Sequence, residues 1–310
     1  MLICVSGTYK SGKSAACNLI NFTKLTIEKA LEGYLFFEDM ESLLCYATSN
    51  WKQNFVIEIR SMEEWLILSK RPFALLLFID APCKLRYERH CQQGEIQDLM
   101  QFITKQDELF IMESHMELSK KATIHINNSF STLEDFKAHL EQLNLANPEW
   151  TRPSWDIYFM KLSQLAATRT NCMKRSVAAI ITKENRVIST GYNGTAMKTK
   201  NCLEGGCSRC NNNSSCGTLL EECLCLHAEE NALLEAGRDR ANGATMYVTS
   251  CPCLGCAKKI AQVGIAQVIY DQSYSMDEAS LKLLTEAGVI LRKYNPSSHF
   301  DFSTLSIKEE

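Results

Sequence analysis

The sequence predicts an α/β protein of two domains, and three observations support this prediction. Strand-like and helix-like segments alternate in both halves of the chain, the pattern of a mostly parallel sheet covered by helices. Ten of the 15 cysteines lie between Cys172 and Cys256, so the halves differ in composition. The stretch 143–153 contains two prolines and no periodicity, as a linker does. We therefore expect domains over 1–143 and 154–294, a linker over 144–153 and a tail over 295–310.

The composition is that of a globular protein rather than a membrane protein. The chain has 310 residues, of which 45% are hydrophobic and 22% charged, and either half can bury its own core. No apolar run reaches the ~18–20 residues that a membrane span needs. The first residues lack the basic region and long apolar stretch of a secretory signal. We expect an intracellular protein of the cytoplasm or the nucleus.

Charge and cysteine content restrict the range of possible functions further. The net charge of −3 and the lack of a basic stripe argue against a general nucleic-acid binder. Disulfides are rare in a reducing compartment, so clustered cysteines favour metal binding and scattered ones favour burial as small apolar side chains.

The elements can be placed along both halves. In the first half, strands are expected over 2–6, 55–59, 73–79 and 123–126, with helices that include 13–21 and 132–143. The second half begins with a helix over 154–167, which Ser154 can cap, and a hairpin over 176–190. A Cys-, Asn- and Gly-rich insert follows over 191–225. Helices over 227–236, 253–262 and 277–287 then alternate with strands over 244–250, 266–270 and 289–293. The second half is thus one three-layer α/β unit.

The most informative motif combines His227-Ala-Glu229 with Pro252-Cys253-Leu-Gly-Cys256, the H-x-E…P-C-x-x-C pattern of zinc deaminases. Catalytic zinc takes three protein ligands and leaves one position for water, and His227, Cys253 and Cys256 supply three. Both segments begin predicted helices, whose N-termini favour thiolate anions. Glu229 is expected to move protons between water, the ring nitrogen and the departing amine. The alternative is a structural zinc beside an uninvolved glutamate.

Several longer stretches together resemble the deoxycytidylate deaminases, which have the cytidine-deaminase fold. The resemblance covers roughly residues 153–294 and is closer to the fungal branch, which carries an N-terminal extension. It implies hydrolysis of dCMP to dUMP and ammonia, which supplies dUMP for dTMP biosynthesis. The matching stretches are NCMKRSVAAII, STGYNGTA, CLCLHAEENALLEAGRDR, MYVTSCPCLGCAKKI and DQSYSMDEA.

The resemblance also implies roles for residues outside the zinc motif. Asn193 matches an asparagine that contacts the substrate, although Asn-Gly is equally a turn former. Tyr274 matches an aromatic residue that closes over the base, or else it lies on an edge strand. Allosteric activation by dCTP, inhibition by dTTP and a homo-oligomeric state are implied as well. Candidates for holding the substrate phosphate are Arg169, Lys174 and Arg175, which are equally consistent with solvated surface charge.

A second, structural zinc is expected in the insert. The hairpin brings Cys172, before its first strand, close to Cys202, after its second. Cys207 follows soon after, Cys223 leads into the His227 helix, and members of the family carry cysteines at these four places. Four thiolates make a closed zinc site that could order a segment poor in apolar residues. Cys207-x-x-Cys210 is a competing pair, and reduced, partly buried thiols are the alternative.

The first domain carries a phosphate-loop motif, Gly7-Thr-Tyr-Lys-Ser-Gly12-Lys13-Ser14, between a predicted strand and a predicted helix. Its backbone N–H groups would surround a phosphate, Lys13 would reach the terminal phosphates and Ser14 would hold Mg²⁺. No acidic residue at the end of a second strand is evident as a partner for the metal, and Asp39 is the one candidate.

The segment Phe78-Ile-Asp-Ala-Pro, with Arg86 and Arg89 after it, resembles nucleoside-monophosphate and dephospho-coenzyme A kinases. The expected first domain is therefore P-loop NTPase-like, either binding a nucleotide with Mg²⁺ or retained as a degenerate scaffold.

Three other functions are compatible with these motifs. A deaminase of transfer RNA or single-stranded DNA uses the same zinc chemistry but needs a basic groove. A kinase or nucleotide sensor could carry the deaminase half as a regulatory domain. A metal-stabilised binding module would need neither Glu229 nor an open zinc position.

Overall fold

The structure is a computed structural model that describes residues 1–28, 31–92, 98–112, 114–212, 214–215, 218–273 and 278–295. It divides into two compact units, Met1–Arg152 and a second that begins at Pro153. Of the tail predicted over 295–310, all but the first residue lies outside the described part. Among the helices described, none combines the length and apolar character needed to cross a membrane.

The first unit is built on a six-stranded sheet in the order β3-β2-β4-β1-β5-β6, with every neighbouring pair parallel. The strands are β1 (Leu2–Gly7), β2 (Thr23–Thr26), β3 (Tyr34–Phe36), β4 (Phe55–Glu58), β5 (Ala74–Asp80) and β6 (Ile124–Asn127). The helices are α1 (Lys13–Leu19), α2 (Met40–Ser49), α3 (Met62–Leu68), α4 (Cys83–Gln92), α5 (Leu99–Met112), α6 (His115–Lys121) and α7 (Leu133–Gln142).

Alternation along the strands produces a separate core on each face of this sheet. Leu2 and Cys4 of β1 pack with residues of α2 and α3, whereas Ile3 and Val5 pack with α1 and α7. The four strands predicted in this half are present to within a residue or two at their ends. Strands β2 and β3 were missed because they are only four and three residues long, and the edge strand β3 has no buried residue, so neither carries a clear apolar alternation.

The second unit contains a five-stranded sheet in the order β13-β12-β11-β7-β8, in which β7 is antiparallel to both neighbours. Its strands are β7 (Ala178–Lys183), β8 (Arg186–Tyr192), β11 (Thr245–Ser250), β12 (Gln267–Gln272) and β13 (Ile290–Lys293). A separate ribbon pairs β9 (Gly194–Thr195) with β10 (Cys225–Leu226). The main helices are α8 (Trp155–Ala167), α10 (Ala228–Ala241), α11 (Leu254–Val263) and α12 (Glu278–Glu286).

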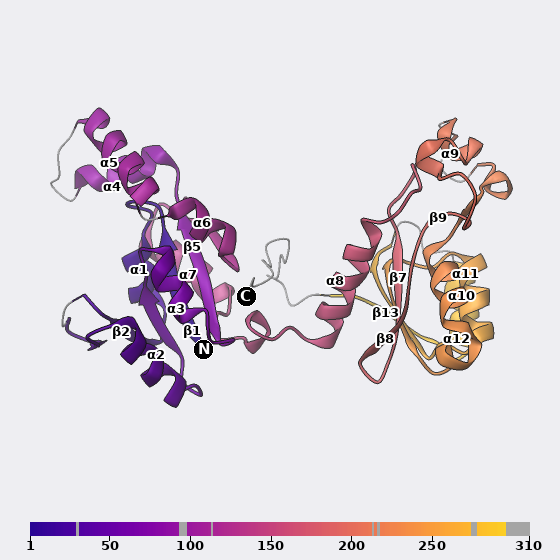
Figure 1. The fold of residues 1–310 in the computed structure, drawn as a ribbon, viewed down its shortest axis with the longest axis horizontal. Helices are drawn as coiled ribbons and strands as arrows, with labels where there is room; N and C mark the ends of the chain where they lie inside the picture. Colours follow the sequence, from indigo (N-terminus) through magenta and orange to yellow (C-terminus); the bar gives the residue numbers. More distant parts are fainter. Residues whose placement is uncertain are drawn as a thin grey trace. The chain divides into compact units, whose positions relative to one another are not determined.

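The helices of this unit cover the two faces of the sheet, as the predicted three-layer arrangement requires (Figure 1). Helix α8 packs on one face against Tyr247 and Ile269, and α10, α11 and α12 pack on the other. Ser154 precedes α8 as predicted, but its side chain makes no capping hydrogen bond. Between β7 and β8, Glu184 and Asn185 both have positive φ, the backbone of a two-residue hairpin turn.

Candidate functional site

His227, Cys253 and Cys256 come together at the N-terminal ends of two neighbouring helices. His227 is the residue before α10, Cys253 is the residue before α11, and Cys256 lies in the first turn of α11. The His227 Nδ1 atom is 3.4 Å from the Sγ atom of Cys253 and 3.4 Å from that of Cys256. These three potential ligand atoms all lie within 4.8 Å of one another.

Tight packing of α10 on the sheet positions this trio. A Cβ atom on Gly191 in β8 would lie 2.3 Å from the carbonyl oxygen of Ala228 and 2.3 Å from the nitrogen of Ala232. Only glycine therefore permits this approach of strand and helix. Ser189, two residues earlier, donates a hydrogen bond to the Ala232 carbonyl at 2.8 Å. The first turn of α10 is thus held from β8.

Glu229 is buried beside the trio, with a side chain only 4% exposed in the first turn of α10. Burial raises the pKa of its carboxyl, because desolvation penalises the charged form. The carboxylate interacts with the thiol of Cys256. A buried carboxyl of raised pKa next to a metal-type ligand set is suited to accepting and returning a proton.

The electrostatics of the trio favour a bound cation. Hydrogen bonds from Cys256 and then His227 lower the pKa of Cys253 to about 3, so that this sulfur is a thiolate at neutral pH. The same Cys253 thiolate raises the pKa of His227 through their hydrogen bond. A cation bound by the three residues would offset the negative charge of the Cys253 thiolate.

The trio has the dimensions of a zinc site. With Zn–N of ~2.0–2.1 Å and Zn–S of ~2.3 Å, tetrahedral angles place nitrogen and sulfur about 3.5 Å apart. The two nitrogen–sulfur distances of 3.4 Å match this value. One imidazole and two sulfur atoms are a donor set suited to zinc, and they leave a fourth position open.

Asn193 lies just before β9, in the loop that follows β8, and is 8% exposed. Its Oδ1 atom accepts hydrogen bonds from Val177 N at 2.9 Å and Thr170 Oγ1 at 2.6 Å. Its Nδ2 atom donates to the Arg175 carbonyl at 2.8 Å, a bond that uses one of its two hydrogens. Asn193 therefore ties together the segment 170–177 through its side chain.

The structure describes only some of the other residues predicted to contact the substrate, and Tyr274 lies outside the described residues. Lys174 donates to the Ser214 carbonyl at 2.7 Å and so interacts with the cysteine-rich insert.

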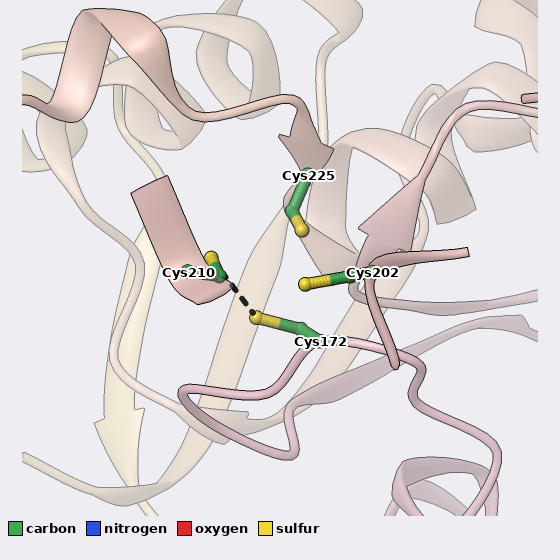
Figure 2. A group of neighbouring side chains, drawn as sticks. All are labelled: Cys172, Cys202, Cys210 and Cys225. Atoms are coloured by element: carbon green, nitrogen blue, oxygen red, sulfur yellow. Dashed lines mark hydrogen bonds between the residues drawn. The ribbon is translucent and has the colours of Figure 1, made fainter. Parts of the chain in front are cut away.

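The cysteines of the insert group differently from the predicted set of Cys172, Cys202, Cys207 and Cys223. Cys172 and Cys202 lie with Cys210 and Cys225, as Figure 2 shows. The other two predicted ligands, Cys207 and Cys223, form a second group that contains the same Cys210 and Cys225. Sequence reasoning treated Cys210 as a competitor and omitted Cys225, although the Cys-x-Cys spacing of 223–225 was a signal.

In the first unit, the phosphate-loop residues line a cavity of about 790 Å³. Gly12 has a φ of +104°, and Lys13 donates to the carbonyl oxygens of Gly7 and Thr8 at 2.8 and 3.3 Å. The Ser14 hydroxyl donates to the carboxylate of Glu58 at 2.7 Å. Strand β1 lies between β4 and β5 in the sheet. Because the loop directly follows β1, it lies at the carboxyl end of the parallel strands, where α/β proteins bind ligands.

Two expectations about this cavity are wrong. Asp39 is not a partner of Ser14, because its side chain caps α2 by accepting a hydrogen bond from Ser42 N at 2.7 Å. An acidic residue does end a second strand, because Glu58 is the last residue of β4, beside β1. The signal was Glu58 itself, the one acidic residue in the predicted strand over 55–59.

A family model, two curated relatives and a solved structure are similar to this chain. A model of the cytidine and deoxycytidylate deaminase zinc-binding region matches residues 153–272. The deoxycytidylate deaminase of Schizosaccharomyces pombe is 45% identical over 276 residues, 87% of this chain and 86% of the relative. That of Saccharomyces cerevisiae is 42% identical over 310 residues, 95% of this chain and 97% of the relative. A crystal structure of dCMP deaminase from cyanophage S-TIM5 with dCMP and dUMP is 29% identical, with a TM-score of 0.37, and covers 46% of this chain and 98% of that one.

Proposed function

Since this chain belongs to the deoxycytidylate deaminase family, we propose that it hydrolyses the amino group at C4 of deoxycytidylate, giving deoxyuridylate and ammonia and supplying deoxyuridylate for thymidylate synthesis. The observation that supports this proposal most directly is the 3.4 Å convergence of His227 on both Cys253 and Cys256 beside the buried Glu229. A binding module has no use for a buried carboxylate next to an incomplete ligand set.

His227, Cys253 and Cys256 are the proposed ligands of the catalytic zinc. Zinc in this position supplies the Lewis acidity that brings the pKa of water close to ~7. The dipoles of α10 and α11, whose N-termini lie at the trio, favour the negative charge of the two sulfur atoms.

Glu229 is the proposed proton carrier. Its carboxylate takes a proton from the attacking water and delivers it to N3 of the cytosine ring. The hydroxide oxygen adds at C4, Glu229 takes the remaining proton from that hydroxyl group and passes it to the amino nitrogen, and the C4–N bond breaks as ammonia leaves and the C4 carbonyl forms. Its burial supports this role, because desolvation raises the pKa of the carboxyl and so favours its proton-carrying form.

Asn193 and Tyr274 are proposed to contact the substrate. The hydrogen of Asn193 Nδ2 that does not bond to Arg175 is available for a sugar or base acceptor. The three bonds already made by its side chain keep the amide rigid, which favours precise orientation of a ligand.

The first unit is proposed to be a P-loop NTPase-like domain that binds a nucleotide with Mg²⁺. Lys13 would release the carbonyls of Gly7 and Thr8 to meet the phosphates, and Ser14 with Glu58 would hold the metal. The parallel sheet, the Gly12 backbone and the cavity at the loop support this proposal. We further propose allosteric activation by dCTP, inhibition by dTTP and a homo-oligomeric enzyme.

We also propose that the cysteine-rich insert binds structural zinc in addition to the catalytic ion. A reducing compartment such as the cytoplasm is the proposed location of the protein. All 14 described cysteines are free of disulfides, in keeping with such a compartment.

The test is ammonia release from deoxycytidylate by zinc-loaded protein, with cytidylate and deoxycytidine as alternative substrates and with or without dCTP. Turnover of deoxycytidylate that disappears in Glu229→Gln is expected. If zinc-loaded protein fails to convert deoxycytidylate with or without dCTP but deaminates single-stranded DNA or transfer RNA, the polynucleotide alternative is correct instead.

A further inference from the structure

Six cysteines of the second unit, five in the insert and Cys172 in the segment before β7, are arranged as two overlapping groups of four. Cys210 and Cys225 belong to both groups. Cys172 and Cys202 complete one group, and Cys207 and Cys223 complete the other. Within each group, every sulfur atom lies within 4.8 Å of the others.

We propose that these six thiolates hold two zinc ions in one binuclear cluster, in which Cys210 and Cys225 bridge the metals. Two tetrahedral ions need eight sulfur positions, and six thiolates provide eight when two of them are shared. Each ion then has two ligands of its own and two bridging ligands, which is the division that the two groups show. A single zinc would use four of these sulfur atoms and leave two thiols beside it without a metal.

The sulfur–sulfur distances agree with this arrangement. Tetrahedral coordination with Zn–S of ~2.3 Å places neighbouring sulfur atoms about 3.8 Å apart. The distance is 3.9 Å from Cys172 to Cys210, 3.8 Å from Cys210 to Cys223 and 4.0 Å from Cys207 to Cys223. The first of these falls in one group and the other two in the second, so each group contains sulfur pairs at a zinc-like distance.

The surroundings stabilise negatively charged sulfur. The N–H groups of Lys174 and Arg175 donate to the sulfur of Cys172, and those of Cys210 and Leu224 donate to Cys207. Six thiolates and two Zn²⁺ ions leave a net charge of −2. The guanidinium group of Arg209, a side chain only 8% exposed, interacts with Cys223 and Cys210 and offsets part of that charge.

The described part of the insert has short regular elements and little apolar burial. These elements are the two-residue strands β9 and β10, the 3₁₀ turns Cys202–Glu204 and Leu220–Glu222 and the four-residue helix α9 (Ser208–Asn211). The large apolar side chains Leu203, Leu219 and Leu224 are exposed by 61%, 45% and 61%. The local core consists of cysteines, with Cys202, Cys207 and Cys210 at its centre. Metal coordination can supply the order that apolar burial does not.

The proposed cluster is connected to the proposed active site by two short segments of the chain. Cys225 pairs with Thr195 in the β9–β10 ribbon and lies two residues before His227. The N–H of Cys172 lies 3.4 Å from Thr170 Oγ1, which in turn donates to Asn193. Two zinc ions would therefore brace both segments that lead to the proposed active site.

The decisive measurement is zinc content per chain, together with zinc X-ray absorption, on the purified full-length protein. Three zinc ions per chain are expected, one catalytic and two in the cluster, and two should remain in His227→Ala. Edge-sharing tetrahedra place the two metals roughly 3 Å apart, so a zinc–zinc vector of that length should appear in both proteins. The proposal would be overturned if the spectrum of His227→Ala lacked that vector, or if this variant bound only one zinc per chain.

Variants of individual cysteines sharpen this test. Cys225→Ser removes a ligand from both ions and should lose both, whereas Cys172→Ser removes a ligand from one and should retain the other. Cys45→Ser changes an exposed cysteine of the first unit and should keep three zinc ions. Equal losses in Cys225→Ser and Cys172→Ser would contradict bridging by Cys225. Because these readouts count metal, they are independent of whether deoxycytidylate is the substrate.

Discussion

The Nδ1 atom of His227 lies 3.4 Å from the Sγ atom of Cys256, although the two residues are 29 positions apart in the chain. The packing of α10 beside α11 on one face of the sheet creates this proximity (Figure 1). Both residues are at helix N-termini, so the fold presents them to a cation before any metal binds. The catalytic zinc is therefore expected to enter a preformed site.

Replacing one proposed ligand of that site should remove one metal and all turnover. We expect Cys253→Ser to hold one zinc per chain fewer than the unaltered protein and to lose deaminase activity, because serine is a poor zinc ligand. Metal analysis and ammonia release measure the two effects, with Cys45→Ser as the control. An active Cys253→Ser protein with full zinc content would show that the metal lies elsewhere.

Glu229→Gln should separate metal binding from catalysis. Zinc content is expected to stay unchanged, while kcat falls by at least about 100-fold because proton transfer is lost. The matched control is Glu230→Gln in the same helical turn, whose carboxylate is 2.5 Å from Lys259. This control should keep most of the activity. Similar rates for Glu229→Gln and Glu230→Gln would refute the assigned role.

Gly191→Ala should damage the site from a distance. The added methyl group would overlap the backbone of Ala228 and Ala232, and relieving such overpacking costs about 1–3 kcal/mol. We expect a lower Tm and weaker zinc retention, because α10 carries His227 and Glu229. Ser189→Ala is the control, since it loses one hydrogen bond to α10 without a clash and should cost about 1 kcal/mol. Unchanged Tm and zinc content in Gly191→Ala would contradict this account of the packing.

Asp39 should make the stability of the first unit depend on pH. Hydrogen bonds from Ser42 lower the pKa of Asp39 below its usual value of 3.8, so the folded state favours the carboxylate. Its contribution is fully present above that usual value and is lost as pH falls through the lower folded pKa. In urea unfolding, the free-energy gap between the unaltered protein and Asp39→Ala should narrow in acid.

The control for this linkage is Asp39→Asn, which can still cap α2 but does not titrate. It should remain more stable than Asp39→Ala across the pH range. A gap between the unaltered protein and Asp39→Ala that stays constant into strong acid would exclude the proposed linkage.

Lys13→Ala should test the phosphate loop. If the first unit binds a nucleoside triphosphate with Mg²⁺, removal of this ammonium group should weaken binding about tenfold or more, as the loss of a charged hydrogen bond does. Calorimetric titration with ATP and Mg²⁺ measures the affinity, and Lys84→Ala, on an exposed face of α4, is the control. Absence of ATP, dCTP and dTTP binding to the unaltered protein would identify the loop as a relic.

Much of this molecule could be predicted from local patterns. The apolar strand Leu2–Gly7 followed by Gly12, Lys13 and Ser14 predicted a strand, loop and helix, because each signal lies within a few neighbouring residues. The proximity of His227, Cys253 and Cys256 was predictable for a similar reason. Cys253 and Cys256 are three apart, so one helical turn brings them together, and the His-x-Glu pattern identifies the partner segment.

The tertiary structure decided the contacts that no local spacing encodes. The contact of Ser14 with Glu58 depends on β4 lying beside β1, and the sharing of Cys210 and Cys225 depends on how a loop folds over the β9–β10 ribbon. Patterns along the chain report which face of an element is buried, whereas distances between remote side chains depend on the order of strands and the path of loops. The sequence alone therefore determined the chemistry of the proposed active site, and the fold determined which thiols lie together.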